Sequence, residues 1–503
     1  MCLIAGIDIG TSGVKMMVLD ENAKVYGKAK RSYTFLSPIN GYAEQHADTW
    51  VEACFDCARE IVKSFPAGIK ADDILSIAFS GQMHGVVMLD KNYREVRPAI
   101  LHCDARSGKQ VAYVKQVLGE DFIRTHLLNP VYSGFMLCSL LWVRDNEPEN
   151  MKKIRYVMSV KDYVKFRFCG RICSDYSDAS ATLLFDMQKV DWSTEIMNRF
   201  GFDRRIFPEC GTSDLVVGQI TSEVASLTGL STNTRVCNGG ADQVMQAIGA
   251  GTVAPGQATS NIGTSGQVCF QCDHPIVNPS LSTNCFVGFD KDHWYTMGAT
   301  MSAGLCYNWL MRVLGVTDFD AMDHRIQNVR VGSGGLIFLP YLSGERCPHL
   351  NTDLTGTFFG LQVNTGAAEM CRAVMEGVSY SLLQCMEICG EFGLHAKEIV
   401  ASGGGAKGMI WPQIQADIYG IPLKSVRIEE QASVGAAITA GSGIGLFSNI
   451  EEGCQKVVKY KDQIFMPNME HHEIYKEYFA LYKEAYITSH NVIEQVTRLG
   501  RRM

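Results

Sequence analysis

The stretches Asp8-Ile-Gly-Thr-Ser-Gly13 and Asn261-Ile-Gly-Thr-Ser-Gly266 repeat one pattern about half a chain length apart. Apolar residues lead into each copy, and an alternating segment follows it, Val14 to Leu19 in the first case and Gln267 to Phe270 in the second. This pattern predicts a strand, a tight glycine turn and an antiparallel strand. Because the unit recurs, we expect two similar domains that face one another.

Helical and strand patterns alternate around both copies, which is typical of α/β layering. The spacing of apolar residues predicts helices over 48–64, 367–389 and 411–419, buried strands over 74–79, 86–89 and 399–401, and a closing amphipathic helix over 471–499. Glycines punctuate the chain between Gly249 and Gly256. We therefore predict an α/β fold with domains at 1–248 and 249–503.

Composition narrows the class of protein. At about 150 residues per domain, 503 residues suggest three folding units or two large ones. Hydrophobic residues make up 46% and charged residues 20%, as in ordinary globular proteins. The formal net charge is −7, and no basic cluster is longer than the one at Arg498, Arg501 and Arg502. These values argue against a nucleic-acid partner.

Location is also indicated by the sequence. Met1 to Gly6 is apolar but lacks a basic flank and soon meets Asp8, so we expect no signal peptide. No apolar run reaches the about 18 residues of a membrane helix. The 18 cysteines are spread along a long chain, which favours free thiols in a reducing cytoplasm.

Two Cys-x-x-Cys pairs, Cys54 with Cys57 and Cys269 with Cys272, have the spacing of a four-thiolate zinc site. The first pair lies in a helical pattern, where thiols three residues apart share the apolar face, and the second lies in an alternating strand. Free cysteine usually packs as a small hydrophobic residue. We therefore expect both pairs to belong to the core.

A Gly-Thr-Ser-Gly turn directs several backbone N–H groups and two hydroxyls to one side, which suits phosphate oxygens. A single such turn is more often an ordinary hairpin, but its recurrence favours a pair of turns that hold a polyphosphate from both sides. Asp8, next to the first turn, is then placed to hold Mg²⁺. The chain lacks a G-x-x-x-x-G-K-[ST] loop, a convincing dinucleotide fingerprint and the protein-kinase motifs.

Several further motifs occur in a fixed order between Ile4 and about Gly445. They are Ser80-Gly-Gln-Met-His-Gly85, Arg97-Pro-Ala-Ile-Leu101, Lys161-Asp-Tyr163, Ser174-Asp-Tyr-Ser-Asp-Ala179, Gly239-Gly-Ala-Asp242, Phe338-Leu-Pro-Tyr-Leu-Ser-Gly-Glu-Arg346 and Ser402-Gly-Gly-Gly-Ala406. With these motifs the sequence resembles the FGGY carbohydrate kinases and, within that family, the bacterial xylulokinases. The resemblance implies two actin-like (ribonuclease-H-like) domains, with ATP held mostly by the second, sugar mostly by the first and the active site in the cleft between them.

The resemblance also implies roles for residues on the nucleotide side. Asp242 matches the family's catalytic aspartate, which contacts the sugar and serves as general base; alone, an Asp after two glycines would be read as a helix N-cap. Asp8 and Asp242 are expected at Mg²⁺. The expected ATP-binding residues are Gly10, Thr11, Ser12, Lys15, Gly263, Thr264, Gly404, Gly405 and Ala406. For Lys15, a solvated strand lysine is an equal alternative.

On the sugar side, Gln82, Met83 and His84 match the family's substrate motif, and Asp104 and Arg106 match its acidic and basic positions. A lone histidine is usually structural, so the argument for His84 depends on its tetrapeptide. Relatives often read Trp-Asn-Asp-x-Arg where this chain has His102-Cys-Asp-Ala-Arg106, and Thr-Ala-Pro-Lys where it has Met136-Leu-Cys-Ser139. These departures leave kinase chemistry intact and leave the sugar open.

The activity implied is therefore ATP-dependent phosphorylation of a ketopentose, with D-xylulose as the leading candidate. The alternatives are a kinase for L-xylulose, ribulose, a ketohexose, a sugar acid or another polyol, a non-sugar actin-like ATPase, and an inactive sugar sensor. The expected partners are a small sugar and ATP, with no nucleic acid and no membrane. Dimers are common in the family, so a homodimer stays open.

Overall fold

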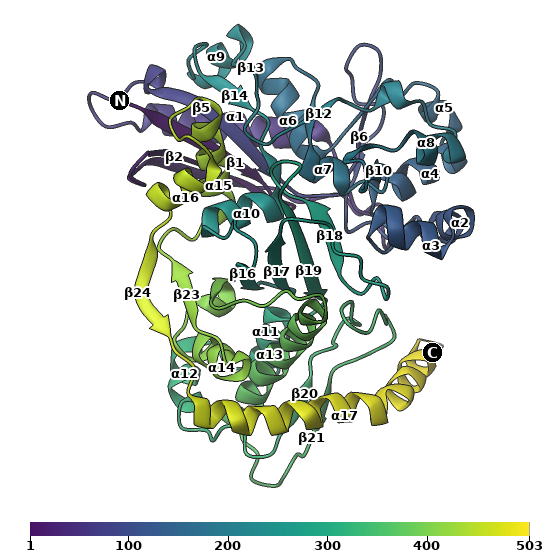
Figure 1. The fold of residues 1–503 in the computed structure, drawn as a ribbon, viewed down its shortest axis with the longest axis vertical. Helices are drawn as coiled ribbons and strands as arrows, with labels where there is room; N and C mark the ends of the chain where they lie inside the picture. The colour runs from purple at the N-terminus through teal and green to yellow at the C-terminus, as the bar shows by residue number, and fades with distance from the viewer. Residues whose placement is uncertain (502–503) are drawn as a thin grey trace.

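The computed structural model describes residues 1–501, which form two α/β halves one above the other (Figure 1). The first half is built around a seven-stranded sheet with the order β13-β14-β5-β1-β2-β3, and β15 pairs with β5. Its strands are β1 (Leu3–Ile9), β2 (Gly13–Asp20), β3 (Val25–Ser32), β5 (Ile74–Gly81), β13 (Val216–Gln219), β14 (Arg235–Cys237) and β15 (Gly240–Ala241).

The second half is built around another seven-stranded sheet, with the order β18-β19-β17-β16-β22-β23-β24. Its strands are β16 (Ala258–Ile262), β17 (Gly266–Cys272), β18 (Asn284–Val287), β19 (Trp294–Thr300), β22 (Ile399–Gly403), β23 (Leu423–Val426) and β24 (Tyr460–Phe465). Both predicted hairpins are present, because β1 pairs antiparallel with β2 and β16 pairs antiparallel with β17.

The duplication extends to the register of the strands. β1 runs parallel to β5, with Asp8 opposite Ser80, and β16 runs parallel to β22, with Asn261 opposite Ser402. Both hairpins therefore project from the same place in their sheets, the edge where the parallel strands end. The predicted duplication of one α/β unit is confirmed.

Two helices lie at the waist between the sheets, α10 (Asp242–Ala250) and α15 (Gln431–Gly443) (Figure 1). α15 comes late in the chain but packs on the first sheet, where the Ser76 hydroxyl donates to the Ala440 carbonyl at 2.7 Å. A Cβ on Gly6 would lie only 1.9 Å from the Ser433 carbonyl oxygen, so glycine allows this close approach. The predicted domain boundary after residue 248 stays a prediction, and α15 crosses it.

The predicted regular elements are confirmed. The helices and short strands expected in the first half are α1 (Ala47–Lys63), β5 and β6 (Val87–Leu89), and those in the second half are α13 (Ala367–Glu391), β22, α14 (Ile410–Tyr419) and α17 (Met469–Gly500). α17 runs along the end of the second half (Figure 1). Further helices of eight or more residues are α2 (Gly108–Leu118), α4 (Met136–Asn146), α6 (Val160–Cys169), α11 (Gly304–Val313), α12 (Phe319–Ile326) and α16 (Ile450–Val457).

The cysteines of the two Cys-x-x-Cys pairs are core residues. Cys54 and Cys57 are buried on α1, and Cys269 and Cys272 are buried on β17. All 18 cysteines are free thiols. The prediction that both pairs pack in the core is confirmed.

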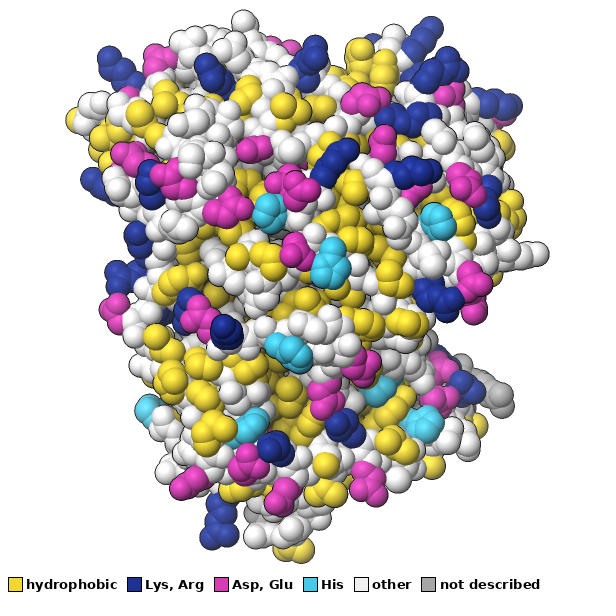
Figure 2. Space-filling view, in the orientation of Figure 1, with side chains coloured by type: hydrophobic (Ala, Val, Ile, Leu, Met, Phe, Trp, Pro, Cys, Tyr) yellow, Lys and Arg dark blue, Asp and Glu magenta, His cyan; other side chains and the backbone are white. Residues whose placement is uncertain are grey.

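In the part of the chain from residue 1 to 501, no helix has both the length and the apolar character needed to cross a membrane. On the face shown in Figure 2, basic and acidic side chains are interspersed, and apolar side chains are exposed between them. The face in view therefore differs from the clustered basic face typical of nucleic-acid binding.

Candidate active site

Asp8 and Asp242 approach the same end of β5 from its two sides. Asp8 on β1 is paired with Ser80, and Gly240 on β15 is paired with the same Ser80. Asp242 follows β15 directly and is the first residue of α10. Because the carboxyl ends of parallel strands meet at one edge of the sheet, these two carboxyl groups share a site there.

Asp8 is fixed by its neighbours. The Ser80 hydroxyl donates to Asp8 Oδ1 at 3.0 Å, and Lys15 is the cross-strand partner of Asp8. Burial raises the pKa of the Asp8 carboxyl above its usual value, while the charge of Lys15 and the bond from Ser80 partly offset that increase. The second oxygen of Asp8 is left available for a ligand.

The Asp242 carboxyl has a strongly raised pKa. Burial raises its pKa to about 7, the negative charge of Asp8 adds to the increase, and the backbone N–H of Gln243 opposes it. A carboxyl group with a pKa near neutrality is suited to accept a proton. The N-cap of α10 is Ala241, so capping is not the role of Asp242.

Gly239 explains how the chain reaches this position. Its φ is +73°, and a Cβ there would lie 1.9 Å from the Phe79 carbonyl oxygen. Only glycine tolerates both conditions without strain. Gly239 therefore packs closely against β5, and this packing places Asp242 at the end of that strand.

The first Gly-Thr-Ser-Gly turn lies beside these carboxyl groups. The Gly10 N–H donates to the Gly13 carbonyl at 3.0 Å and closes the turn, and the Thr11 hydroxyl donates to Gln82 Oε1 at 3.2 Å. Ser12 and Lys15 are exposed. The turn therefore presents polar groups to solvent next to Asp8, as a phosphate contact requires.

The second turn opens into two adjoining pockets. Gly263, Thr264, Gly404 and Gly405 line a pocket of about 550 Å³, whose apolar walls include Tyr307, Met375 and Trp411. Lys15 and Ala406 line a neighbouring pocket of about 320 Å³, which shares Gly404 with the first. The predicted nucleotide-binding residues of the second half are thus brought together, next to Lys15 of the first half.

His84 has a defined protonation state. Its Nδ1 lies 2.8 Å from the Ala181 carbonyl oxygen, which can only accept, so Nδ1 carries the proton. Burial lowers the pKa of His84 to about 3, and the charges of His102 and Arg346 contribute to the decrease. The imidazole is therefore neutral at pH 7, and its Nε2 is a hydrogen-bond acceptor.

Gln82 makes its contact within the first half, and Met83 makes its contact with the second half. Gln82 is buried and accepts from Thr11 of the first turn, whereas the Tyr295 hydroxyl of β19 lies 3.7 Å from Met83 Sδ. The ring of His84 also lies 5.9 Å from that of Phe286 on β18. The predicted substrate tripeptide is therefore placed where the two halves meet.

Asp104 and Arg106 pair with one another. The Arg106 guanidinium donates to Asp104 Oδ2 at 2.7 Å and to Glu44 Oε1 at 2.6 Å, and it stacks on the Tyr42 ring. The Ala43 N–H also donates a hydrogen bond to Asp104 Oδ2. Both side chains are buried and engaged with these neighbours, so their predicted contact with sugar stays a prediction.

Two features of the site were not predicted from the sequence. One is the bond from Ser80 to Asp8, and the other is Arg346, an exposed side chain that makes no ion pair within residues 1–501. Burial is the main cause that lowers the pKa of His102 to about 4, and the positive charge of Arg346 adds to the decrease. Both residues lie in motifs quoted above, but a motif gives no direction for a side chain.

Comparisons with known proteins agree with this architecture. Residues 3–249 match the N-terminal domain and residues 258–444 the C-terminal domain of the FGGY family of carbohydrate kinases. Xylulose kinase of Bacillus subtilis (strain 168) is 35% identical over 491 residues, which cover 97% of both chains. Xylulose kinase of Escherichia coli (strain K12) is 30% identical over 483 residues, 96% of this chain and 98% of the relative.

Solved structures show the same fold. A ligand-bound xylulose kinase from Lactobacillus acidophilus superposes with a TM-score of 0.91 at 25% identity, over 97% of this chain and 98% of that one. A gluconate kinase from the same organism gives a TM-score of 0.90 at 24% identity and the same coverage. The predicted pair of actin-like domains is confirmed, and the chain belongs to the FGGY family of carbohydrate kinases and is a sugar kinase.

Proposed function

We propose that this kinase transfers the γ-phosphoryl group of ATP to the terminal primary hydroxyl of a ketopentose, D-xylulose first, with Asp242 as the general base. The position of Asp8 and Asp242 at one end of β5, beside the first Gly-Thr-Ser-Gly turn and next to the tripeptide of His84, carries the proposal. The names of the curated relatives support the choice of sugar.

The donors at this edge fit Mg²⁺. Asp8 and Asp242 are carboxylates close enough for the charge of one to raise the pKa of the other, and oxygen is the ligand that Mg²⁺ prefers. When bound, Mg²⁺ neutralises charge on the phosphates. A nearby cation also favours the ionised form of Asp242, which is the form that a base needs.

The proton and the phosphoryl group move in opposite directions. The Asp242 carboxylate takes the proton of the sugar hydroxyl while the oxygen of that hydroxyl forms a bond to the γ-phosphorus. The bond from the γ-phosphorus to the bridging oxygen breaks, and ADP leaves with that oxygen. Backbone N–H and hydroxyl groups of Thr11, Ser12 and Thr264 bind phosphate oxygens on both sides of the cleft.

The sugar subsite is formed by side chains with fixed hydrogen-bonding roles. His84 Nε2 accepts from a sugar hydroxyl, since Nδ1 is committed to the Ala181 carbonyl. Met83 supplies an apolar wall against the sugar carbons, and Gln82 joins this subsite to the first turn through Thr11. The pocket lined by Gly404, Gly405 and Trp411 receives the adenosine.

A different sugar is the second candidate. The solved neighbours include a gluconate kinase and a Plasmodium falciparum glycerol kinase with ADP, so the fold accommodates several acceptors. His102 and Cys103 stand where relatives often have Trp and Asn. His102 is partly buried, and its Nδ1 has no hydrogen-bond partner among the described residues. This polar substitution beside Arg346 favours an acceptor with an additional oxygen, such as a sugar acid.

A panel assay distinguishes the candidates. Release of ADP is measured with D-xylulose, L-xylulose, D-ribulose, D-fructose, gluconate and glycerol at saturating Mg-ATP. We expect the highest kcat/KM for D-xylulose. Absence of sugar-dependent ADP release with every ketopentose contradicts the proposal, and a higher kcat/KM for gluconate supports the second candidate.

The free thiols support a reducing compartment, and we propose the cytoplasm as the location. We retain 1–248 and 249–503 as the proposed division into domains. Under this division α15 is an arm of the second domain that packs on the first sheet, next to α10.

A further inference from the structure

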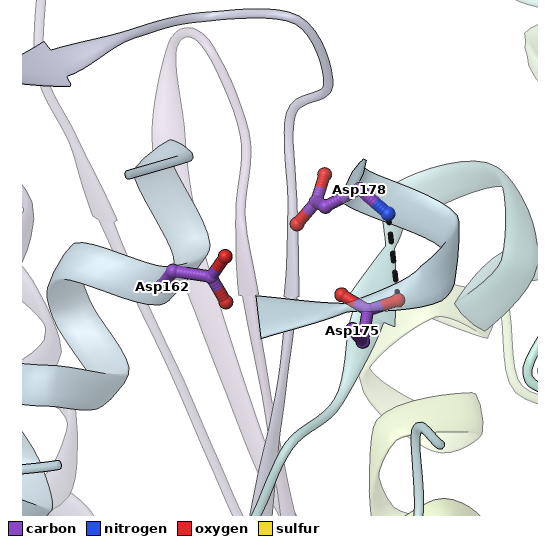
Figure 3. Close-up of side chains that lie close together, drawn as sticks. All are labelled: Asp162, Asp175 and Asp178. Atoms are coloured by element: carbon purple, nitrogen blue, oxygen red, sulfur yellow. Dashed lines mark hydrogen bonds between the residues drawn. The ribbon is translucent and has the colours of Figure 1, made fainter. Parts of the chain in front are cut away.

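Three aspartates converge behind the site, in the interior of the first half. Asp162 lies on α6, Asp175 on β9 (Ser174–Asp175) and Asp178 on α7 (Tyr176–Ser180). One oxygen of each lies within 4.8 Å of the others, and Figure 3 shows the three carboxyl groups turned toward a common space. All three side chains are buried.

The ammonium group of Lys161 fills that space. Its Nζ lies 2.6 Å from Asp162 Oδ1, 2.9 Å from Asp175 Oδ1 and 3.4 Å from Asp178 Oδ2. Lys165 adds a second ammonium, 2.9 Å from Asp162 Oδ1. An internal cation therefore takes the place that a metal ion would occupy between these carboxyl groups.

Opposite charges meet in this cluster. Burial raises the pKa of the Asp178 carboxyl well above its usual value, which favours its neutral form. Burial also acts to raise the pKa of Asp162, but Lys161 and Lys165 outweigh it and hold that pKa below its usual value. The buried ammonium groups of Lys161 and Lys165 are thus paired with carboxyl groups, as buried charges must be.

The cluster holds one end of residues 238–241, the segment that leads into Asp242. Lys161 Nζ donates to the Asn238 carbonyl at 3.4 Å, and Lys165 Nζ donates to Asn238 Oδ1. Asn238 Nδ2 in turn donates to the Ser174 carbonyl at 2.8 Å, next to Asp175. The first residue of this segment is therefore tied to the cluster by three hydrogen bonds.

Ser177 holds the other end of the same segment. Its hydroxyl donates to Asp175 Oδ2 and accepts from the Ala241 N–H at 2.9 Å. Because Asp175 only accepts, the single hydroxyl proton points to it, and the lone pairs of Ser177 Oγ face Ala241. The ion pair of Lys161 with Asp175 thus fixes the direction of the Ser177 hydroxyl.

We propose that Ser177 is a positioning residue for Asp242, held in orientation by the buried pair of Lys161 and Asp175. The proposal rests on the proposed function, in which Asp242 is the base. A base must stay within hydrogen-bond reach of its proton, and misplacement by about 1 Å costs on the order of 100-fold in rate. Ser177 acts one peptide away from Asp242, which makes it the most direct of these supports.

The test compares Ser177→Ala with Ser159→Ala in the full-length enzyme. Ser159 is the control, because its hydroxyl donates to Asp178 Oδ2 at 3.0 Å and accepts from the Asp162 N–H at the start of α6, so it touches the cluster but makes no hydrogen bond to residues 238–241. We expect kcat of Ser177→Ala to fall by about 10- to 100-fold, with KM for sugar and for ATP within about twofold of wild type. Ser159→Ala is expected to keep kcat near wild type.

A double-mutant cycle with Asp242→Asn separates positioning from a structural role. If Ser177 acts through Asp242, Ser177→Ala lowers kcat little further once Asp242 is Asn. Equal kcat losses in Ser177→Ala and Ser159→Ala, or full additivity with Asp242→Asn, overturn the positioning role. Near-normal turnover of Asp242→Asn alone overturns the proposed function instead.

Hydrogen exchange of the wild-type enzyme gives a readout that needs no variant. The Ala241 N–H is expected to exchange as slowly as the amides of β1, because its acceptor is buried and fixed. Fast exchange at Ala241 contradicts the proposal even if Ser177→Ala fails to fold.

Discussion

The two Gly-Thr-Ser-Gly turns have identical sequences and different surroundings. In the first hairpin Asp8 faces Lys15 across the strands, whereas in the second Asn261 faces Gln267. The residue pair at this end of the strands thus has opposite charges in one half and two neutral amides in the other. Under the proposed function, both halves supply a backbone turn for phosphate, but only the first half supplies the carboxyl groups for transfer.

The turns also close differently. The Gly10 N–H donates to the Gly13 carbonyl, whereas the Gly263 N–H donates to the Ser265 carbonyl, both at 3.0 Å. Accordingly, Ile9 pairs with Val14, while Ile262 pairs with Gly266. The second hairpin is one residue tighter, so equal tetrapeptides do not present their N–H groups identically.

Among changes to the two hairpins, the largest effect is expected from making the first hairpin like the second. Asp8→Asn introduces the amide found at Asn261, removes a negative charge and keeps the size of the side chain. We expect kcat to fall by on the order of 10²- to 10³-fold, as for loss of other groups that stabilise transferring charge. Steady-state kinetics over a range of Mg²⁺ concentrations measure this, and a kcat unaffected by the substitution would show that the halves are equivalent.

The next effect is a pH dependence of the activity, which follows from the protonation of Asp242 in the first half. Since the pKa of Asp242 is raised to about 7, the carboxyl is protonated below that pH and cannot accept a proton. We expect kcat/KM for sugar to fall about tenfold per pH unit below the inflection and to be level above it. Bound Mg²⁺ lowers the inflection, because the cation favours the carboxylate. A profile that is flat down to pH 5 would contradict this assignment.

The reverse exchange should have a smaller effect. Asn261→Asp places a carboxylate beside the second turn, where it repels phosphate. We expect KM for ATP to rise about tenfold, which corresponds to about 1.4 kcal/mol, with kcat within about threefold. If kcat falls as far as in Asp8→Asn, the second half takes a direct part in transfer. Asn261→Ala, at the same position and without a change in charge, is the control.

Much of the fold was readable from local patterns. The repeated hairpin predicted the duplication, and apolar periodicity predicted α1, α13, α14 and α17, because each pattern reflects one buried face of one element. The packing of α15 on β1 was not readable, since it joins Ser433 to Gly6 across most of the chain. Contacts of that kind depend on tertiary shape and leave no local period.

The site was readable to the extent that its residues lie in short motifs. Asp8, His84 and Asp242 were predicted in this way, and the structure places them near the meeting of the two halves. The Lys161 cluster was seen as two motifs without a role, because its ion pairs join residues on three separate elements. The mutual pairing of Arg106 and Asp104 was likewise hidden, since sequence does not show which charges neutralise each other.

The most direct test of the central claim is the turnover of Asp242→Asn at saturating Mg-ATP and sugar. The substitution keeps the shape of the side chain and removes the base. We predict that kcat falls by on the order of 10²- to 10⁴-fold, while calorimetry shows that ATP and the sugar still bind. Turnover within a few-fold of wild type, with both ligands bound, would contradict the account.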